Sequence, residues 1–178
     1  MQKRVLWITT TAVFIALLIG AQAATASMSQ FVTGSLVNLI LITSVMISGP
    51  ASGLTVAFLS PVLAKLVGIG PPVWILIPFI MAGNMTLVII WYLIGKRRVA
   101  DRYLMRIVAL VTAAVCKFLV LYLGIVKLAV PLLANLPPKM ATAVTASFSW
   151  PQLVTALIGG AVAYVILPVI EMAVTKNK

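Results

Sequence analysis

Long apolar stretches, separated only by short breaks, constrain this chain more than any other feature of its sequence. They lie at residues 5–24, 34–47, 51–69, 73–94, 104–130 and 150–174. The 178 residues are 63% hydrophobic and 8% charged, with a mean hydropathy of +1.20. A soluble domain of this size has too little interior to hide so much apolar surface, so the surrounding solvent must be lipid. The sequence predicts an all-α integral membrane protein, a single domain over residues 1–178 with six transmembrane helices.

The breaks between these stretches carry residues that end helices. They are Gly49-Pro50, the run GIGPP at residues 68–72, the run KRR at residues 96–98, and Pro137-Pro138. The second stretch is short for a bilayer core of about 30 Å. We therefore expect its helix to be tilted or to begin within the preceding loop. The segments near residues 25–33, 70–72 and 131–149 are expected to be loops.

Basic residues predict the orientation of the chain. Most of them fall at the N-terminus, in the loop between the fourth and fifth spans, and at the C-terminus: Lys3, Arg4, Lys96, Arg97, Arg98, Arg102, Arg106, Lys176 and Lys178. Six spans put all three sites on one side, and the positive-inside rule makes that side cytoplasmic. Both termini are then cytoplasmic and the other three loops face outward. The net charge of +11 is explained by topology, so we expect no nucleic-acid partner.

The first apolar stretch also looks like a secretory signal peptide, because MQKR precedes it and the small-residue run AQAATAS follows it. Cleavage there would leave five spans. The C-terminal lysines would then lie outside, against the charge rule. We therefore expect this stretch to be retained as the first span.

The sequence argues against catalysis. Its only acids are Asp101, in the loop RRVADR, and Glu171, near the cytoplasmic end of the last span, and it has no histidine. We expect Asp101 to balance its basic neighbours, and Glu171 lies too shallow for proton coupling. The lone Cys116 offers no metal site, and the phosphate-binding pattern GxxxxGK[ST] is absent. We expect a binding protein without catalytic residues, metal or cofactor, driven by a partner that hydrolyses nucleotide.

Two polar residues lie deep within predicted spans, where polar groups are costly and often functional. Asn84 is roughly 16 Å from the outer end of the fourth span, and Lys117 is roughly 20 Å from the inner end of the fifth. The two are therefore at similar depth and are expected to line one cavity. Alternatively, Asn84 makes an interhelical hydrogen bond and Lys117 extends toward the surface. We expect Asn38, in the second span, to serve packing.

Residues near the outer ends of the spans complete the candidate substrate-binding set. They are Gln30, Phe31, Trp74, Tyr122, Trp150 and Gln152. Aromatic residues at this level also form the interfacial belt of membrane proteins, and for Trp150, within SWPQ, both interpretations stay open. At the inner end we assign Trp91 and Tyr92 to that belt.

Small residues recur every four positions in the first span, at Ala12, Ala16, Gly20 and Ala24. On a helix they form one stripe. Such a stripe allows close backbone approach, which is a main source of attraction between helices in lipid. The stripe alone does not show whether it meets a partner or the chain's own helices.

Together these features resemble the substrate-binding S components of energy-coupling factor (ECF) transporters, which are vitamin importers of the ABC class. The resemblance covers almost the whole chain. It rests on the order and spacing of the Ala12 stripe, the segment GSLVNLILITSVMISGPASGLTVAFLSPVLAKLVGIGP, the stretch IPFIMAGN, and SWPQLVTALIGG before the last span. The Gly-Pro turn followed by a small-residue third helix also fits.

The resemblance implies a mechanism and partners. An S component binds its vitamin from outside and delivers it by toppling in the membrane, after docking through its small-residue stripe on a coupling transmembrane subunit. Two ATPase subunits supply the energy, and all three partners are separate chains. The resemblance further implies the cell membrane of a Gram-positive bacterium.

The substrate is the least determined part of the resemblance. The similarity points to a cobalamin-specific branch, and a corrinoid with amide-rich edges would suit Asn, Gln, Ser and aromatic contacts. A queuosine precursor, folate or pantothenate stay open, and Lys117 would suit an anionic group on the last two. Outside this class, a small channel or exporter that dimerises through the stripe, or an assembly subunit, remain alternatives.

Overall fold

Every predicted apolar stretch is helical in the computed structural model, which describes residues 2–96, 102–133 and 136–176. The longer helices are α1 (Gln2–Ala24), α2 (Gln30–Ser48), α3 (Pro50–Leu66), α4 (Ile77–Ile90), α5 (Arg102–Leu121) and α8 (Trp150–Lys176). Shorter elements are η1 (Trp74–Leu76), the π-helical η2 (Trp91–Gly95) and η3 (Tyr122–Ala129), α6 (Val130–Leu132) and α7 (Pro138–Ser147). The described ranges contain no strand.

The helices have the length and composition of membrane spans. Five helical stretches are long and apolar enough to cross a bilayer: Arg4–Ala24, Gln30–Ser48, Trp74–Gly95, Tyr103–Leu132 and Pro138–Ala173. Helix α3 is apolar but shorter, with 17 residues. The prediction of an all-helical, multi-pass membrane protein is confirmed.

Two segments that the sequence predicts as loops are partly helical. Helix α2 begins at Gln30 rather than near residue 34, within the loop before the short second stretch. Helix α7 occupies most of the predicted loop at residues 131–149. Of the Pro137-Pro138 pair, Pro138 starts α7, because the first position of a helix needs no backbone N–H donor.

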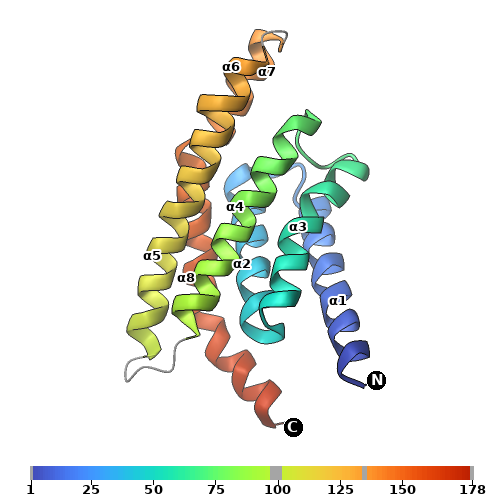
Figure 1. Ribbon diagram of the computed structural model, residues 1–178, viewed down its shortest axis with the longest axis vertical. Coiled ribbons are helices and arrows are strands. Elements are labelled where there is room, and N and C mark those ends of the chain that lie inside the picture. The colour runs from blue at the N-terminus through green and yellow to red at the C-terminus, as the bar shows by residue number, and fades with distance from the viewer. Residues whose placement is uncertain (1, 97–101, 134–135, 177–178) are drawn as a thin grey trace.

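Helix α2 is central and α1 is peripheral. Helix α2 contacts α1, α3, α4 and α8, whereas α1 packs mainly on α2 and α3. Buried residues make up 44% of the most apolar window of α2 but only 11% of that of α1. Both termini lie at the same end of the bundle (Figure 1).

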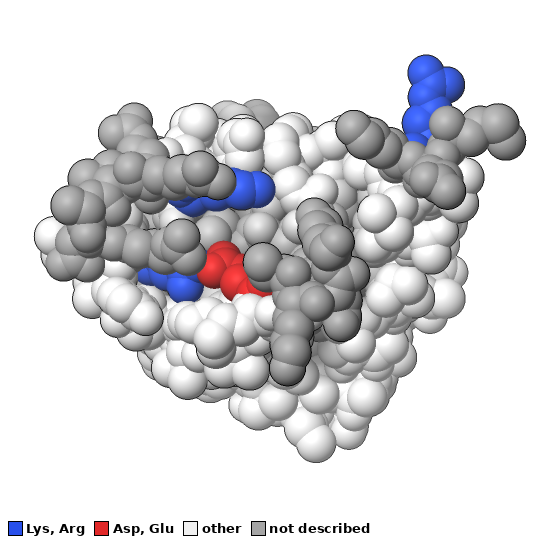
Figure 2. Space-filling view, turned by 90° about the horizontal axis from the view of Figure 1, so that it is seen from below, with Lys and Arg blue, Asp and Glu red and all other residues white. Residues whose placement is uncertain are grey.

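That end of the bundle carries charged side chains (Figure 2). Arg106 of α5 is 2% exposed, and its Nη2 donates to both carboxylate oxygens of Glu171 of α8 at 2.7 Å. The pair links the two helices near the chain termini. Asp101, which we expected to balance basic neighbours, lies outside the described residues.

Glycines bring α2 and α8 into close contact. A Cβ added to Gly159 would lie 2.5 Å from the carbonyl oxygen of Ser35 and 2.8 Å from the Cβ of Asn38. A Cβ added to Gly34 would lie 2.9 Å from Cγ2 of Thr155. These approaches fix the face of α2 that carries Asn38 against α8.

The assignment of Trp91 to the interfacial belt is wrong. Its side chain is fully buried in the main apolar core. Space for the indole comes from Gly95, since a Cβ there would lie 3.0 Å from a ring atom. Tyr92 is partly exposed, and the Nζ of Lys96 lies 5.6 Å from its ring centroid.

Candidate functional site

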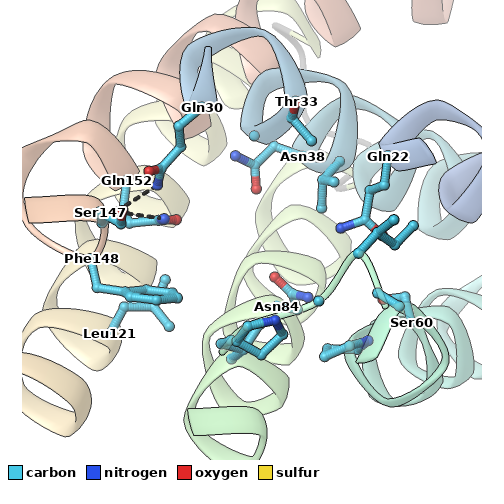
Figure 3. Close-up of a pocket in the computed structure, with 18 of the residues that line it drawn as sticks. Gln22, Gln30, Thr33, Asn38, Ser60, Asn84, Leu121, Ser147, Phe148 and Gln152 are labelled. Carbon is cyan, nitrogen blue, oxygen red and sulfur yellow. Dashed lines mark hydrogen bonds between the residues drawn. The ribbon is translucent and has the colours of Figure 1, made fainter. Parts of the chain in front are cut away.

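A cavity of about 320 Å³ lies among α1, α2, α3, α4, α5, the end of α7 and the start of α8 (Figure 3). The starts of α2 and α8 lie toward the end of the bundle away from the termini (Figure 1). Its lining includes several amide and hydroxyl side chains and one lysine. The polar lining residues are Gln22, Gln30, Thr33, Asn38, Ser60, Asn84, Lys117, Ser147 and Gln152. Apolar lining residues include Val37, Pro61, Ile80, Leu121 and Phe148. The cavity is therefore apolar in part, with a few converging polar groups, as small-molecule sites usually are.

Lys117 is the only charged side chain that lines the cavity in the described part of the chain. It is 3% exposed, and its Nζ donates to the Oδ1 of Asn38 at 2.5 Å and to the Oδ1 of Asn84 at 2.8 Å. Asn38 in turn donates from Nδ2 to the Oγ1 of Thr155 at 3.4 Å. The network joins α5, α4, α2 and α8. It satisfies two of the three ammonium donors with neutral acceptors and offers no negative charge.

One wall of the cavity is held by two glutamines that share an acceptor. The Nε2 atoms of Gln30 and Gln152 donate to the carbonyl oxygen of Ser147 at 2.6 Å and 3.0 Å (Figure 3). Ser147 is the last residue of α7, and carbonyls at a helix C-terminus lack partners within the helix. The two bonds fasten the corner between α7 and α8 to the start of α2.

The opposite side of the cavity carries polar atoms without a partner (Figure 3). The Oε1 of Gln22, from α1, and the Oγ of Ser60, from α3, are both buried and make no hydrogen bond with described residues. A buried acceptor left unsatisfied costs free energy on the order of 1–3 kcal/mol. Both atoms line the cavity, so a bound molecule or water can satisfy them.

The structure brings four of the eight predicted substrate-binding residues to this cavity. They are Gln30, Asn84, Lys117 and Gln152. The depth estimate that placed Asn84 beside Lys117 agrees with their hydrogen bond of 2.8 Å. Lys117 does not extend to the surface, since it is 3% exposed.

The other four predicted residues, all aromatic, do not line the cavity. Phe31 and Trp150 pack on each other with ring centroids 5.5 Å apart. Trp74 is 55% exposed, and Tyr122 stacks on Phe118 at 5.5 Å. Aromatic identity near an outer loop does not specify which way the ring faces, so belt and pocket residues look alike in the sequence.

Sequence reasoning missed several lining residues. Asn38, expected to serve packing, is a direct partner of Lys117. Gln22 lies between Gly20 and Ala24 of the small-residue stripe, and Ser60 lies in a helix rich in small residues. The available signal was that each of these three polar residues lies on an apolar helix at a similar depth. The sequence does not reveal that the three helices are neighbours.

The small-residue stripe of α1 faces away from the bundle. Ala12, Ala16, Gly20 and Ala24 are all exposed, and a Cβ on Gly20 would meet no atom within 4 Å. The buried face of α1 is a different one: Thr11 donates to the Oγ of Ser52 at 2.9 Å. The alternative that the stripe packs on the chain's own helices is therefore wrong.

Comparison with known proteins gives one match. Residues 6–171 match the family model described as "ECF transporter, substrate-specific component". No curated protein and no solved structure matches the chain significantly. The match spans nearly the whole helical bundle, including every polar residue of the cavity. The chain therefore belongs to the family of substrate-specific components of ECF transporters.

Proposed function

We propose that this chain captures a small organic nutrient in the cavity around Lys117 and delivers it through an ECF module made of a coupling transmembrane subunit and two ATPase subunits. The observation that carries the proposal is the buried network of Lys117, Asn38 and Asn84 inside a 320 Å³ cavity. Buried polar groups within spans are expensive and are usually functional. Family membership supports the transport role.

We further propose six spans with both termini cytoplasmic. The termini share one end of the bundle (Figure 1). Arg4 and Arg106 belong to helices that begin at this end, and Lys96 follows a helical segment that ends there. The positive-inside rule makes that end cytoplasmic. Helix α3 is the sixth span, because 17 residues extend about 25 Å. The cavity then opens toward the outer side, from which a nutrient arrives.

The cavity volume bears on the choice of nutrient. Ligand sites for drug-sized molecules measure about 300–1,000 Å³, so 320 Å³ is at the small end of that range. A corrinoid such as cobalamin is much larger and would require the outer helices to move apart. The observed cavity favours a smaller nutrient, such as pantothenate, over the cobalamin suggested by the sequence.

The stripe of α1 is proposed as the docking face for the coupling subunit. Its four small residues are exposed, and α1 is the least buried of the helices that can span a bilayer in the described chain. A flat apolar face suits a membrane partner, since close backbone approach supplies attraction that bulky side chains would prevent.

The first test is equilibrium binding to the purified chain in detergent. The panel contains cobalamin, cobinamide, folate, pantothenate and a queuosine precursor, with folding checked by circular dichroism. Saturable one-to-one binding of a panel member supports the proposal. A folded chain that binds none of them and does not copurify with a coupling subunit and ATPases would contradict it.

Docking is tested separately with Ala16→Leu and Gly20→Leu. Both sites are exposed, so the isolated chain should fold and bind its nutrient normally. Overpacking at an interface costs about 1–3 kcal/mol, so copurification and uptake should fall by about 5- to 100-fold. The matched control is Val111→Leu on α5, a 49% exposed site remote from α1. Normal uptake by both stripe variants would exclude the docking role.

A further inference from the structure

The charge of Lys117 has no counter-charge in the described structure. Its hydrogen-bond partners among the described residues are the amide oxygens of Asn38 and Asn84. The sequence contains two acids, of which Glu171 is bound to Arg106 near the terminal end of the bundle and Asp101 lies outside the described residues. A buried ammonium is costly when no opposite charge accompanies it.

The cavity presents two kinds of polar group. The ammonium of Lys117, held by its two asparagines, can donate one further hydrogen bond. The unsatisfied Oε1 of Gln22 can only accept a hydrogen bond, and the unsatisfied Oγ of Ser60 can donate and accept. Apolar side chains lie among these groups, including Val37, Ile80 and Leu121 in the part of the lining that the structure describes.

We infer that the ligand is a small amphipathic monocarboxylate, whose carboxylate pairs with Lys117 and whose hydroxyl or amide N–H group is accepted by Gln22 and Ser60. This inference rests on the proposed function. A cavity of 320 Å³ lies at the small end of the range for drug-sized ligands, so it suits a small nutrient. The single lysine favours one negative charge rather than two. The apolar lining favours an aliphatic or small cyclic body over a sugar.

The alternative is that Lys117 serves only to tie α2, α4 and α5 together. If Lys117 had only this structural role, the cavity would bind charged and neutral ligands of the same shape with equal affinity. The two roles therefore differ in a measurable preference, namely the ratio of affinities for an acid and for its neutral analogue of nearly equal shape.

The experiment measures binding of matched pairs by calorimetry on the full chain in detergent. The pairs are pantothenate with pantothenol, and nicotinate with nicotinamide, and cobinamide is included as a large neutral ligand. The wild type should bind at least one acid about 10- to 100-fold more tightly than its neutral partner, because hydrogen bonds to charged groups are worth about 1.5–3 kcal/mol.

Three variants identify the group responsible. Lys117→Met should lose the preference for the acid while keeping the weaker affinity for the neutral analogue, which also proves that the variant folds. Lys117→Arg should retain part of the preference. Lys127→Met is the matched control, because Lys127 follows on the same helical segment but is exposed and does not line the cavity. It should bind like the wild type.

The outcomes separate this inference from the proposed function. Equal affinity for acid and neutral analogue, or an acid preference that survives Lys117→Met, overturns the inference and leaves the transport function intact. Binding of cobinamide without binding of either acid also overturns the inference and leaves the transport function intact. Failure of a folded chain to bind any compound, together with failure to copurify with an ECF module, overturns both.

Discussion

The close contact between α2 and α8 gives a prediction that depends on a single methyl group. In Gly159→Ala the new Cβ would lie 2.5 Å from the carbonyl oxygen of Ser35 and 2.8 Å from the Cβ of Asn38. Ordinary van der Waals contact begins near 3.4 Å, so α2 and α8 must separate by close to 1 Å. The obstructing atoms belong to the backbone or lie next to it, so no side-chain rotation can relieve them.

The expected magnitude follows from two opposing terms. Overpacking costs about 1–3 kcal/mol, and the constraint from backbone atoms places this site in the upper half of that range. The higher helix propensity of alanine offsets about 1 kcal/mol of this loss in stability. The net loss is about 1–2 kcal/mol, which lowers the melting temperature of a chain of this size by about 2–8 °C.

The assay is thermal unfolding of the purified variant in detergent, followed by tryptophan fluorescence. Gly20→Ala is the matched control, because a Cβ there meets nothing within 4 Å and the helix propensity term acts alone. Its melting temperature should stay the same or rise slightly. Gly159→Ala should also weaken ligand binding, since Asn38 holds Lys117. A Gly159→Ala protein as stable as Gly20→Ala would refute the close packing of α2 on α8.

Two further predictions concern the cavity wall and the ion pair. Gln30→Ala removes the hydrogen bond from α2 to the end of α7, so the nutrient should dissociate faster while the melting temperature changes little. Stopped-flow measurement of nutrient release tests this. An unchanged release rate would exclude a role for this contact in retaining the nutrient. Arg106→Met removes both hydrogen bonds from Nη2 to the carboxylate of Glu171, and thermal unfolding should show a loss of about 1–3 kcal/mol. Because Glu171 is 28% exposed, breaking this pair should cost less free energy than breaking a fully buried one. An Arg106→Met protein with wild-type stability would mean that solvent already screens the pair.

Much of the helical architecture was predictable from local features. Apolar runs long enough for a bilayer specify helices, because backbone polar groups must be satisfied within each span. Helix α7 was missed, since its ten residues are too short for a span and Pro137-Pro138 has the pattern of a break. Half of the predicted substrate-binding set lines the cavity, and for Asn84 and Lys117 a count of 1.5 Å per residue along two spans had already placed both at one depth.

Which face of each helix points toward the interior of the bundle could not be predicted from this sequence. Asn38, Gln22 and Ser60 join the cavity only because α1, α2 and α3 turn those positions inward. Trp91 lies where a belt residue is expected, but its ring is buried in the main core, where Gly95 of its own helical segment leaves space for it. Hydrophobic periodicity is a weak guide in a membrane protein, because lipid and protein interior are equally apolar.

The sequence by itself determined the solvent and the helical class, and it limited the acids of the chain to Asp101 and Glu171, since these follow from composition and span length. Only the tertiary structure decided which helices are neighbours, that the small-residue stripe faces outward, and that Lys117 meets two asparagines in one cavity. The reason is physical: depth in the membrane is set by distance along one helix, whereas direction around the helix axis is set by packing between helices far apart in the chain.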